Sequence, residues 1–230
     1  MNSNKQMSEQ VRKKPGKVYM FLQGNFTNLD YESRSEDDIK ADVETITACF
    51  ENLGFDVEKP LIDGTKEDIQ SLITEEKNSN DWSQYESLLV FFVTLSPAAG
   101  DLLCKDCIFN EEEMISIMKG PAHTPLLKLF VFQASQAKSN KVSMTDNDGN
   151  SETRLPIEAN FFVIKSSFER EAPQSENGSY FLKIFCQILK ELGNKTSLFD
   201  VMTVVLRKLK ANRSYKTEHS RNNMLPEVTS

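Results

Sequence analysis

Several features that would assign a protein to a specialised class are scarce or missing in this sequence. Four cysteines in 230 residues are too few for a disulfide-stabilised scaffold, which indicates a reducing compartment. The longest apolar run, residues 88–93, is far shorter than the roughly 20 residues of a membrane-spanning helix. A formal net charge of −7, without a long run of Lys and Arg, argues against nucleic acid and anionic membranes as partners. These absences predict a soluble, cytoplasmic protein.

Histidine is equally scarce, and the one metal-binding pattern is incomplete. The two histidines are His123 and His219, so residues 1–122 contain no imidazole. Cys104 and Cys107 have the C-x-x-C spacing of a zinc knuckle, but no second pair of Cys or His ligands follows at a suitable distance. The simpler interpretation is two small apolar residues in a turn, and neither a metal nor another cofactor is expected.

The sequence does contain a regular alternation of strand and helix patterns. Short apolar runs typical of strands occur at residues 18–22, 55–57, 88–95, 127–137 and 161–164. Amphipathic helices are expected between and after them, with N-terminal capping residues at Ser35, Thr65, Ser179 and Ser197 and stops at Gly54 and Gly193. This alternation, without an internal repeat, predicts a single α/β domain with a doubly wound, largely parallel sheet.

Residues 127–137 are central to the functional interpretation. Their first half is a short apolar run that suits a strand buried on both faces of a parallel sheet. Their second half, Gln133-Ala134-Ser135-Gln136-Ala137, is expected where the strand emerges, at the edge where open α/β sheets place their functional residues. This stretch resembles the nucleophile strand of the caspases, in which Gln-Ala-Cys-x-Gly follows an apolar strand.

The resemblance to caspases continues in family order from about residue 18 to residue 230. The matching segments are Ser33-Arg34-Ser35, Phe50-Glu51-Asn52-Leu53-Gly54-Phe55, Leu155-Pro156-Ile157-Glu158-Ala159-Asn160-Phe161, Asn177-Gly178-Ser179-Tyr180-Phe181 and Leu225-Pro226-Glu227-Val228. The resemblance implies the caspase fold, a three-layer α/β/α sandwich with a mostly parallel central sheet.

The same resemblance implies that the catalytic residues have been replaced. Ser135 stands where the family has its cysteine nucleophile, and Pro97 stands where it has the histidine base. Proline cannot accept a proton, and a serine nucleophile depends on a base more than a cysteine does. His123 precedes the nucleophile strand, whose length would separate it from Ser135 by roughly 25 Å. We therefore expect no peptidase activity; a serine hydrolase acting through the Ser135 hydroxyl is the less favoured alternative.

The substrate pocket is expected to be retained only in part. In the family, two Arg and one Gln hold an acidic substrate side chain through charge-assisted, bidentate contacts. Arg34 and Gln133 match two of these residues, but the run that matches the second Arg reads Glu171-Ala172-Pro173-Gln174. Tight binding of Asp-containing peptides is therefore not expected. The plainer interpretation of Arg34 is a solvated loop arginine beside Glu32 and Glu36.

The resemblance also divides the chain into parts. Residues 1–16 are expected to form a short disordered leader, as in effector caspases, which leaves no room for a death-fold recruitment domain. Residues 17–230 are expected to form one domain, in which residues 17–137 resemble the large subunit, 138–153 the loop cut between subunits, and 154–230 the small subunit.

Two further sites follow from this division. Asp148 in the inter-subunit loop is a candidate processing site, although a polar loop with an incidental Asp explains it equally well. Pro226, Glu227, Val228 and Thr229 match the entry to the strand along which caspases dimerise.

These features together predict a non-catalytic caspase homologue, of the kind described as decoys in insects and other animals. It is expected to regulate apoptosis by pairing with a paralogous active caspase, and a homodimer is a second form of pairing. Enhancement of the partner is favoured over inhibition because the core motifs indicate a chain that folds. The alternative is a dominant-negative protein, or a decoy that binds caspase substrates or inhibitors.

Overall fold

The computed structural model describes residues 13–26, 29–79, 81–98, 100–118, 126–138, 160–166, 177–193, 195–214 and 227–229. The strands are β1 (Lys17–Leu22), β2 (Asp56–Val57), β3 (Leu61–Ile62), β4 (Ser87–Ser96), β5 (Asp101–Leu103), β6 (Ile108–Asn110), β7 (Leu127–Gln136), β8 (Phe161–Ser166) and β9 (Glu227–Thr229). The helices are α1 (Glu36–Asn52), α2 (Lys66–Ser79), α3 (Glu111–Met118), α4 (Tyr180–Leu192) and α5 (Leu198–Ser214), and a short 3-10 helix, η2, spans Trp82–Gln84.

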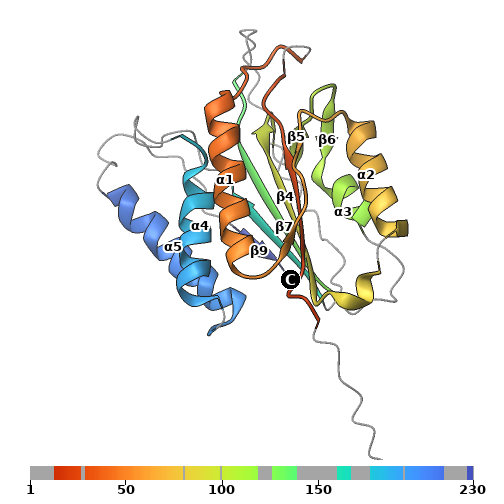
Figure 1. Ribbon diagram of the computed structural model, residues 1–230. Coiled ribbons are helices and arrows are strands. Elements are labelled where there is room, and N and C mark those ends of the chain that lie inside the picture. Colours follow the sequence, from red (N-terminus) through yellow and green to blue (C-terminus); the bar gives the residue numbers. More distant parts are fainter. Residues whose placement is uncertain are drawn as a thin grey trace, which may run out of the picture.

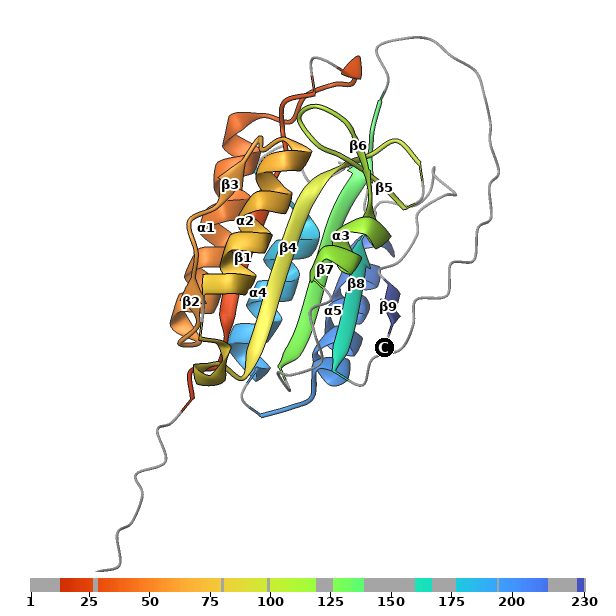
Figure 2. The ribbon, with the colours of Figure 1, turned by 90° about the vertical axis from the view of Figure 1, so that its right-hand side faces the viewer.

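The central sheet has the strand order β2–β1–β4–β7–β8–β9, and β3 pairs with the C-terminal end of β1 (Figure 2). Its neighbouring strands run parallel, except that β9 runs antiparallel to β8. The long strands β4 and β7 lie at the centre and are buried along most of their length, as continuous apolar runs require. The mostly parallel sheet expected from the sequence is confirmed.

Helices cover both faces of this sheet, which gives three layers (Figure 1). Helices α1, α4 and α5 pack on one face, where side chains such as Phe50, Phe91 and Phe185 form the larger core. Helices α2 and α3 pack on the other face, around side chains such as Phe92 and Phe130. The expected α/β/α sandwich is therefore confirmed.

The capping patterns of the first two helices are also confirmed. At the start of α1, the Ser35 hydroxyl accepts from the backbone N–H of Asp38 at 3.1 Å and donates to the Asp38 carboxylate at 2.6 Å. Thr65 and Asp68 make the reciprocal pair of bonds at the start of α2. Gly54 ends α1 with a φ of +81°, a left-handed conformation that favours glycine.

Ser179 departs from the sequence-based expectation. It occupies the N-cap position of α4, but its side chain makes no capping hydrogen bond. Instead, its hydroxyl donates to the Asp42 carboxylate of α1 at 2.9 Å, and its backbone N–H donates to the other oxygen of that group at 2.6 Å. The hydroxyl donates to a buried carboxylate of another helix, a charge-assisted bond, and so it joins two helices rather than capping one.

Two other features were not anticipated. A short hairpin, β5–β6, fills the segment between β4 and α3, where its six strand residues are too few to produce a recognisable period. Gln133 and Ala134, expected where the strand emerges, are instead buried within β7, which ends at Gln136. The reason is that β7 lies between β4 and β8, and pairs with β4 along its whole length.

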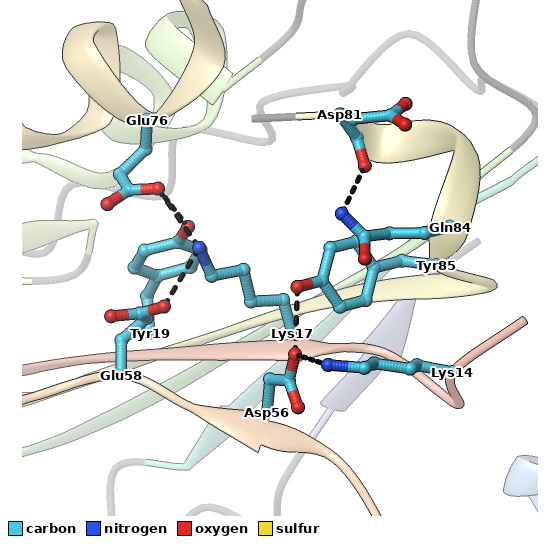
Figure 3. Close-up of polar contacts among 9 residues, drawn as sticks. All are labelled: Lys14, Lys17, Tyr19, Asp56, Glu58, Glu76, Asp81, Gln84 and Tyr85. Carbon is cyan, nitrogen blue, oxygen red and sulfur yellow. Dashed lines mark hydrogen bonds and ion pairs between the residues drawn. The ribbon is translucent and has the colours of Figure 1, made fainter. Parts of the chain in front are cut away.

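The N-terminal end of the sheet carries a buried polar cluster (Figure 3). Lys17, whose side chain is only 6% exposed, pairs with Glu58 at 2.8 Å and with Glu76 at 3.1 Å. The hydroxyl of Tyr19 donates to Glu76 at 2.7 Å. The ammonium also lies over the Trp82 ring, 5.9 Å from its centroid. These contacts pair the buried charge, as its stability requires.

Residues 13–16, expected within the leader, join the same end of the structure. Lys14 forms a parallel bridge to Tyr85, and its ammonium lies 2.6 Å from the Asp56 carboxylate. The ordered chain therefore includes the end of the expected leader, whose residues 1–12 lie outside the described residues.

Candidate functional site

The candidate site lies at the C-terminal edge of the sheet, opposite the Lys17 cluster. Parallel strands β4, β7 and β8 end there side by side, because Val93 pairs with Gln133 and Gln133 pairs with Ser166. Ligand sites of open α/β sheets lie at this edge. The structure therefore places the expected nucleophile strand where chemistry would occur.

Ser135 and Pro97 come together at this edge, as the sequence predicts. Ser135 pairs with Leu95, and Pro97 follows β4 directly after the last pair, Ser96 with Gln136. The backbone N–H of Ala137 donates to the Ser96 carbonyl at 2.8 Å, which extends the contact between the strands beyond the ladder. From strand spacing and rise, the Cα atoms of positions 97 and 135 lie about 8 Å apart. A histidine at position 97 would reach a side chain at position 135; proline has neither a base nor an N–H.

The hydroxyl of Ser135 is half-buried and faces the amide of Gln133, whose Nε2 donates to Ser135 Oγ at 3.5 Å. A hydroxyl needs a neighbouring base to become a nucleophile. Both histidines of the chain, His123 and His219, lie outside the described residues, so none of the described side chains is an imidazole. Among the described residues, the Ser135 hydroxyl accepts from an amide, and Pro97 follows the end of the neighbouring strand.

Arg34 is buried, which contradicts the interpretation of a solvated loop arginine. Its side chain is 7% exposed, and Nη2 lies 2.5 Å from the carboxylate of Asp42, which is 1% exposed. The backbone N–H of Arg34 donates to the Gly24 carbonyl at 2.8 Å, just beyond the end of β1. Arg34 thus lies at the same edge of the sheet as Gln133, on the face covered by α1, because a buried acid holds it there.

Asp42 was missed by sequence reasoning. Its carboxylate accepts from Arg34, from the Ser179 N–H and from the Ser179 hydroxyl. It therefore connects α1 and the loop before it to the start of α4, and Asp42 and Ser179 are 137 residues apart in the chain. The signal that could have found it is an acidic residue on the otherwise apolar face of α1, between Ile39 and Ile46.

Buried polar atoms of four side chains at this edge have no hydrogen-bond partner in the described part of the chain. They are Nε2 and Oε1 of Gln23, Nη1 of Arg34, Oε1 of Gln133 and Oγ of Ser166. Gln133 and Ser166 are neighbours in register and are 3% and 2% exposed. Buried polar groups ordinarily find partners, so these atoms mark this edge as a candidate pocket for a polar ligand. Ser166 was not anticipated because a single serine at a strand end carries no pattern.

The remaining sequence-based sites are only partly covered by the structure. Asp148 and Pro226 lie outside the described residues. Glu227, Val228 and Thr229 form β9, which pairs with β8 and ends the strand order on that side. The candidate pairing strand is therefore an edge strand.

The described residues contain neither a metal-binding cluster nor a membrane-spanning helix. Within them, no group of three or more His, Cys, Asp or Glu is arranged to hold a metal ion. None of their helices is both long enough and apolar enough to cross a membrane.

Comparison with known proteins agrees with this architecture. Caspase-1 of Spodoptera frugiperda is 24% identical over 197 residues, which cover 80% of this chain and 65% of that relative, slightly less than two thirds of its length. A solved structure described as pro-sf-caspase-1 superposes with a TM-score of 0.79 at 23% identity, covering 95% of this chain and 88% of that one, which shows the fold. A family model described as the caspase domain matches residues 25–230. The chain therefore belongs to the caspase family.

Proposed function

We propose that this member of the caspase family is not a peptidase and that it regulates apoptosis by pairing with a paralogous active caspase and raising its activity. The observation that carries the proposal is the pair of positions at the ends of β4 and β7. Pro97 and Ser135 occupy adjacent strand ends at which a cysteine peptidase needs a base and a thiol. In well-studied proteases, losing such groups costs about 10⁶ in rate.

The intact fold around these positions supports a role as a partner. Apolar side chains form a core on each face of the sheet, and none of the described strands pairs with the outer side of β9, which could therefore accept another strand. An edge of this kind suits pairing with a second chain of the same fold through added main-chain hydrogen bonds.

Enhancement of the partner has a simple physical basis. A chain that binds the active arrangement of a partner's loops more tightly than the inactive one shifts the partner toward activity. Shifting an equilibrium from 1:99 to 99:1 requires about 10⁴-fold preference, and smaller preferences give proportionally smaller gains. The partner needs a stable surface for this effect, not catalytic residues.

The test is peptide-substrate turnover by a paralogous effector caspase, co-expressed with or without this protein. We expect higher turnover with the protein present, none from the protein alone, and none from its Ser135→Cys variant, which still lacks a base at position 97. Val228→Pro, which places a proline at the centre of β9, should abolish the gain, whereas Thr203→Ser on the exposed face of α5 should preserve it. Activity of the wild-type protein alone, or unchanged turnover in the mixture, would contradict the proposal.

A second candidate function is a decoy that suppresses caspases by binding their substrates or inhibitors, and lower turnover in that experiment would favour it. Nη1 of Arg34, which has no partner among the described residues, supports it, because a carboxylate could accept a hydrogen bond from this group. Titration calorimetry with an Asp-aldehyde peptide tests it directly. If the protein is a decoy, the Asp-aldehyde peptide should bind to the wild-type chain and not to the Arg34→Met variant. No heat of binding with the wild-type chain would exclude this function.

A further inference from the structure

The turn between β5 and β6 brings two cysteines together. Leu103 pairs with Ile108 in the antiparallel hairpin, and the backbone N–H of Cys104 donates to the Cys107 carbonyl at 2.9 Å. Cys104 and Cys107 are therefore opposite each other, with Lys105 and Asp106 between them. Cα atoms of opposite antiparallel residues lie about 4.5–5.5 Å apart, within the range of about 4.4–6.8 Å that a disulfide spans.

The two thiols differ in access to solvent, which suits two different roles. Both cysteines are free thiols. Cys104 is fully buried, whereas Cys107 is only partly buried at the edge of the same core and retains some contact with solvent. An accessible thiol can attack an incoming disulfide, and a buried thiol beside it can complete the exchange.

We propose that Cys104 and Cys107 form a thiol–disulfide exchange site that reacts with small disulfides of the glutathione type. The Cys107 thiolate attacks one sulfur of oxidised glutathione, displaces one glutathione thiolate and leaves a mixed disulfide. The Cys104 thiol then attacks the Cys107 sulfur, and its proton passes to the departing thiolate of the second glutathione. Two protein thiols and one oxidised glutathione become one protein disulfide and two reduced glutathiones, and two electrons pass to glutathione.

The surroundings hold the turn in place and set its reactivity. The backbone N–H of Lys66 at the start of α2 donates to the Asp106 carboxylate at 3.0 Å, so the turn is anchored to the body of the protein. Burial raises the pKa of both thiols; the Asp106 charge raises it further, Glu113 adds a smaller increase at Cys107, and the Lys66 ammonium acts in the opposite direction on both. Exchange should therefore accelerate as pH rises from 7 to 9, by up to about tenfold per unit.

A second thiol pair in the same chain provides an internal comparison. Cys49 of α1 donates to the Cys186 carbonyl of α4 at 3.5 Å, and both side chains lie inside the core. Neither thiol reaches solvent, since their exposures are 0% and 2%. The reaction is therefore assigned to the turn and not to this pair.

The experiment uses the reduced full-length chain incubated with oxidised glutathione, quenched by alkylation and analysed by intact mass. The wild-type chain should lose two alkylatable thiols, and without alkylation its mass should fall by about 2 Da, the two hydrogens lost. Trypsin cuts after Lys105, between the two cysteines, so the disulfide alone will hold the two resulting peptides together.

Two variants separate the turn from the core pair. Cys107→Ser should abolish the linked peptides, and the double variant Cys49→Ser, Cys186→Ser should form them as the wild type does. The proposal is overturned if the wild-type chain keeps four alkylatable thiols at pH 9, or if the disulfide joins Cys49 to Cys186. Because the wild-type protein itself gives the decisive result, a variant that folds poorly does not affect the test.

Discussion

At the scale of single residues, Asp42 positions Arg34 of the candidate site, although no sequence motif points to it. It is 1% exposed and binds Arg34, so the cation of the candidate pocket is already partly neutralised. It also binds both the N–H and the hydroxyl of Ser179. One buried carboxylate therefore positions the pocket and joins the two halves of the chain.

Replacing Asp42 should be costly. Asp42→Asn keeps an oxygen that can accept from Ser179 but leaves the Arg34 charge buried without its counter-ion. We expect a loss of about 3–5 kcal/mol in the free energy of unfolding, measured by urea denaturation, because an unpaired buried charge carries its full desolvation penalty. Glu44→Gln on the exposed face of α1 should stay within about 0.5 kcal/mol.

A rescue variant separates this cause from a general disturbance of α1. In the double variant Arg34→Met, Asp42→Asn the buried charge is gone, the Asn oxygen can accept from the Ser179 N–H, and the Asn NH2 group can donate to the Ser179 hydroxyl. It should recover a large part of the lost stability. A double variant no more stable than Asp42→Asn would show that the charge pair is not the source of the effect.

At the scale of secondary-structure elements, the two ends of the sheet have different roles. The N-terminal end is closed by paired charges and phenols (Figure 3), whereas the C-terminal end carries buried polar atoms that have no partner among the described residues. The Tyr85 hydroxyl donates to Asp56 at 2.8 Å, and burial together with that bond raises the pKa of Tyr85 to about 12. Burial and the bond to Glu76 raise the pKa of Tyr19 still further.

These shifts predict base-induced unfolding. A phenol whose pKa is higher in the folded than in the unfolded protein stabilises the fold fully at a pH below its unfolded-state pKa, which is about 10. This stabilisation is lost as the pH rises toward the folded-state pKa. The free energy of unfolding should therefore fall from about pH 10 to pH 12, by up to about 1.4 kcal/mol per pH unit for each phenol. Denaturant titrations followed by circular dichroism across this range measure the slope.

Tyr85→Phe removes one of the two phenol hydroxyls, those of Tyr19 and Tyr85, from this end of the sheet. It should lower stability at neutral pH by about 1 kcal/mol through the lost hydrogen bond and make the decline above pH 10 less steep. Tyr19→Phe should act in the same direction. An alkaline slope equal to that of the wild type in both variants would contradict this account.

At the scale of the whole molecule, the halves on either side of residues 138–153 form a single body. Strand β7 of the first half pairs with β8 of the second along six residue pairs, and α4 packs against α1. The sheet therefore has no boundary at which the halves would separate.

This continuity predicts the result of proteolysis in the loop. An active caspase should cut after Asp148, and the two fragments should still elute together in size-exclusion chromatography because the β7–β8 ladder and the Asp42–Ser179 bonds remain. Gel electrophoresis of the eluted peak detects the cut, and Asp148→Ala should prevent it. An uncut wild-type chain after prolonged incubation, or fragments that elute apart, would count against the prediction.

The amino-acid sequence by itself determined the features that depend on local pattern. Apolar runs located β1, β4, β7 and β8, capping residues located the starts of α1 and α2, and the ordered motifs led to the caspase family, which the family model confirms. These features can be predicted from the sequence because strand burial and helix capping depend on residues that are close together in the chain.

Only the tertiary structure decided how the site is held. It buried Arg34 against Asp42 and turned the Ser179 hydroxyl away from its own helix. It also brought the Cys104 and Cys107 thiols together in a hairpin that the hydrophobic pattern of the sequence does not predict. The first two of these contacts join side chains from separate segments, and all three depend on how the chain packs. A buried charge takes the partner that the fold brings to it, because leaving it unpaired in a low dielectric costs more than any local hydrogen bond returns.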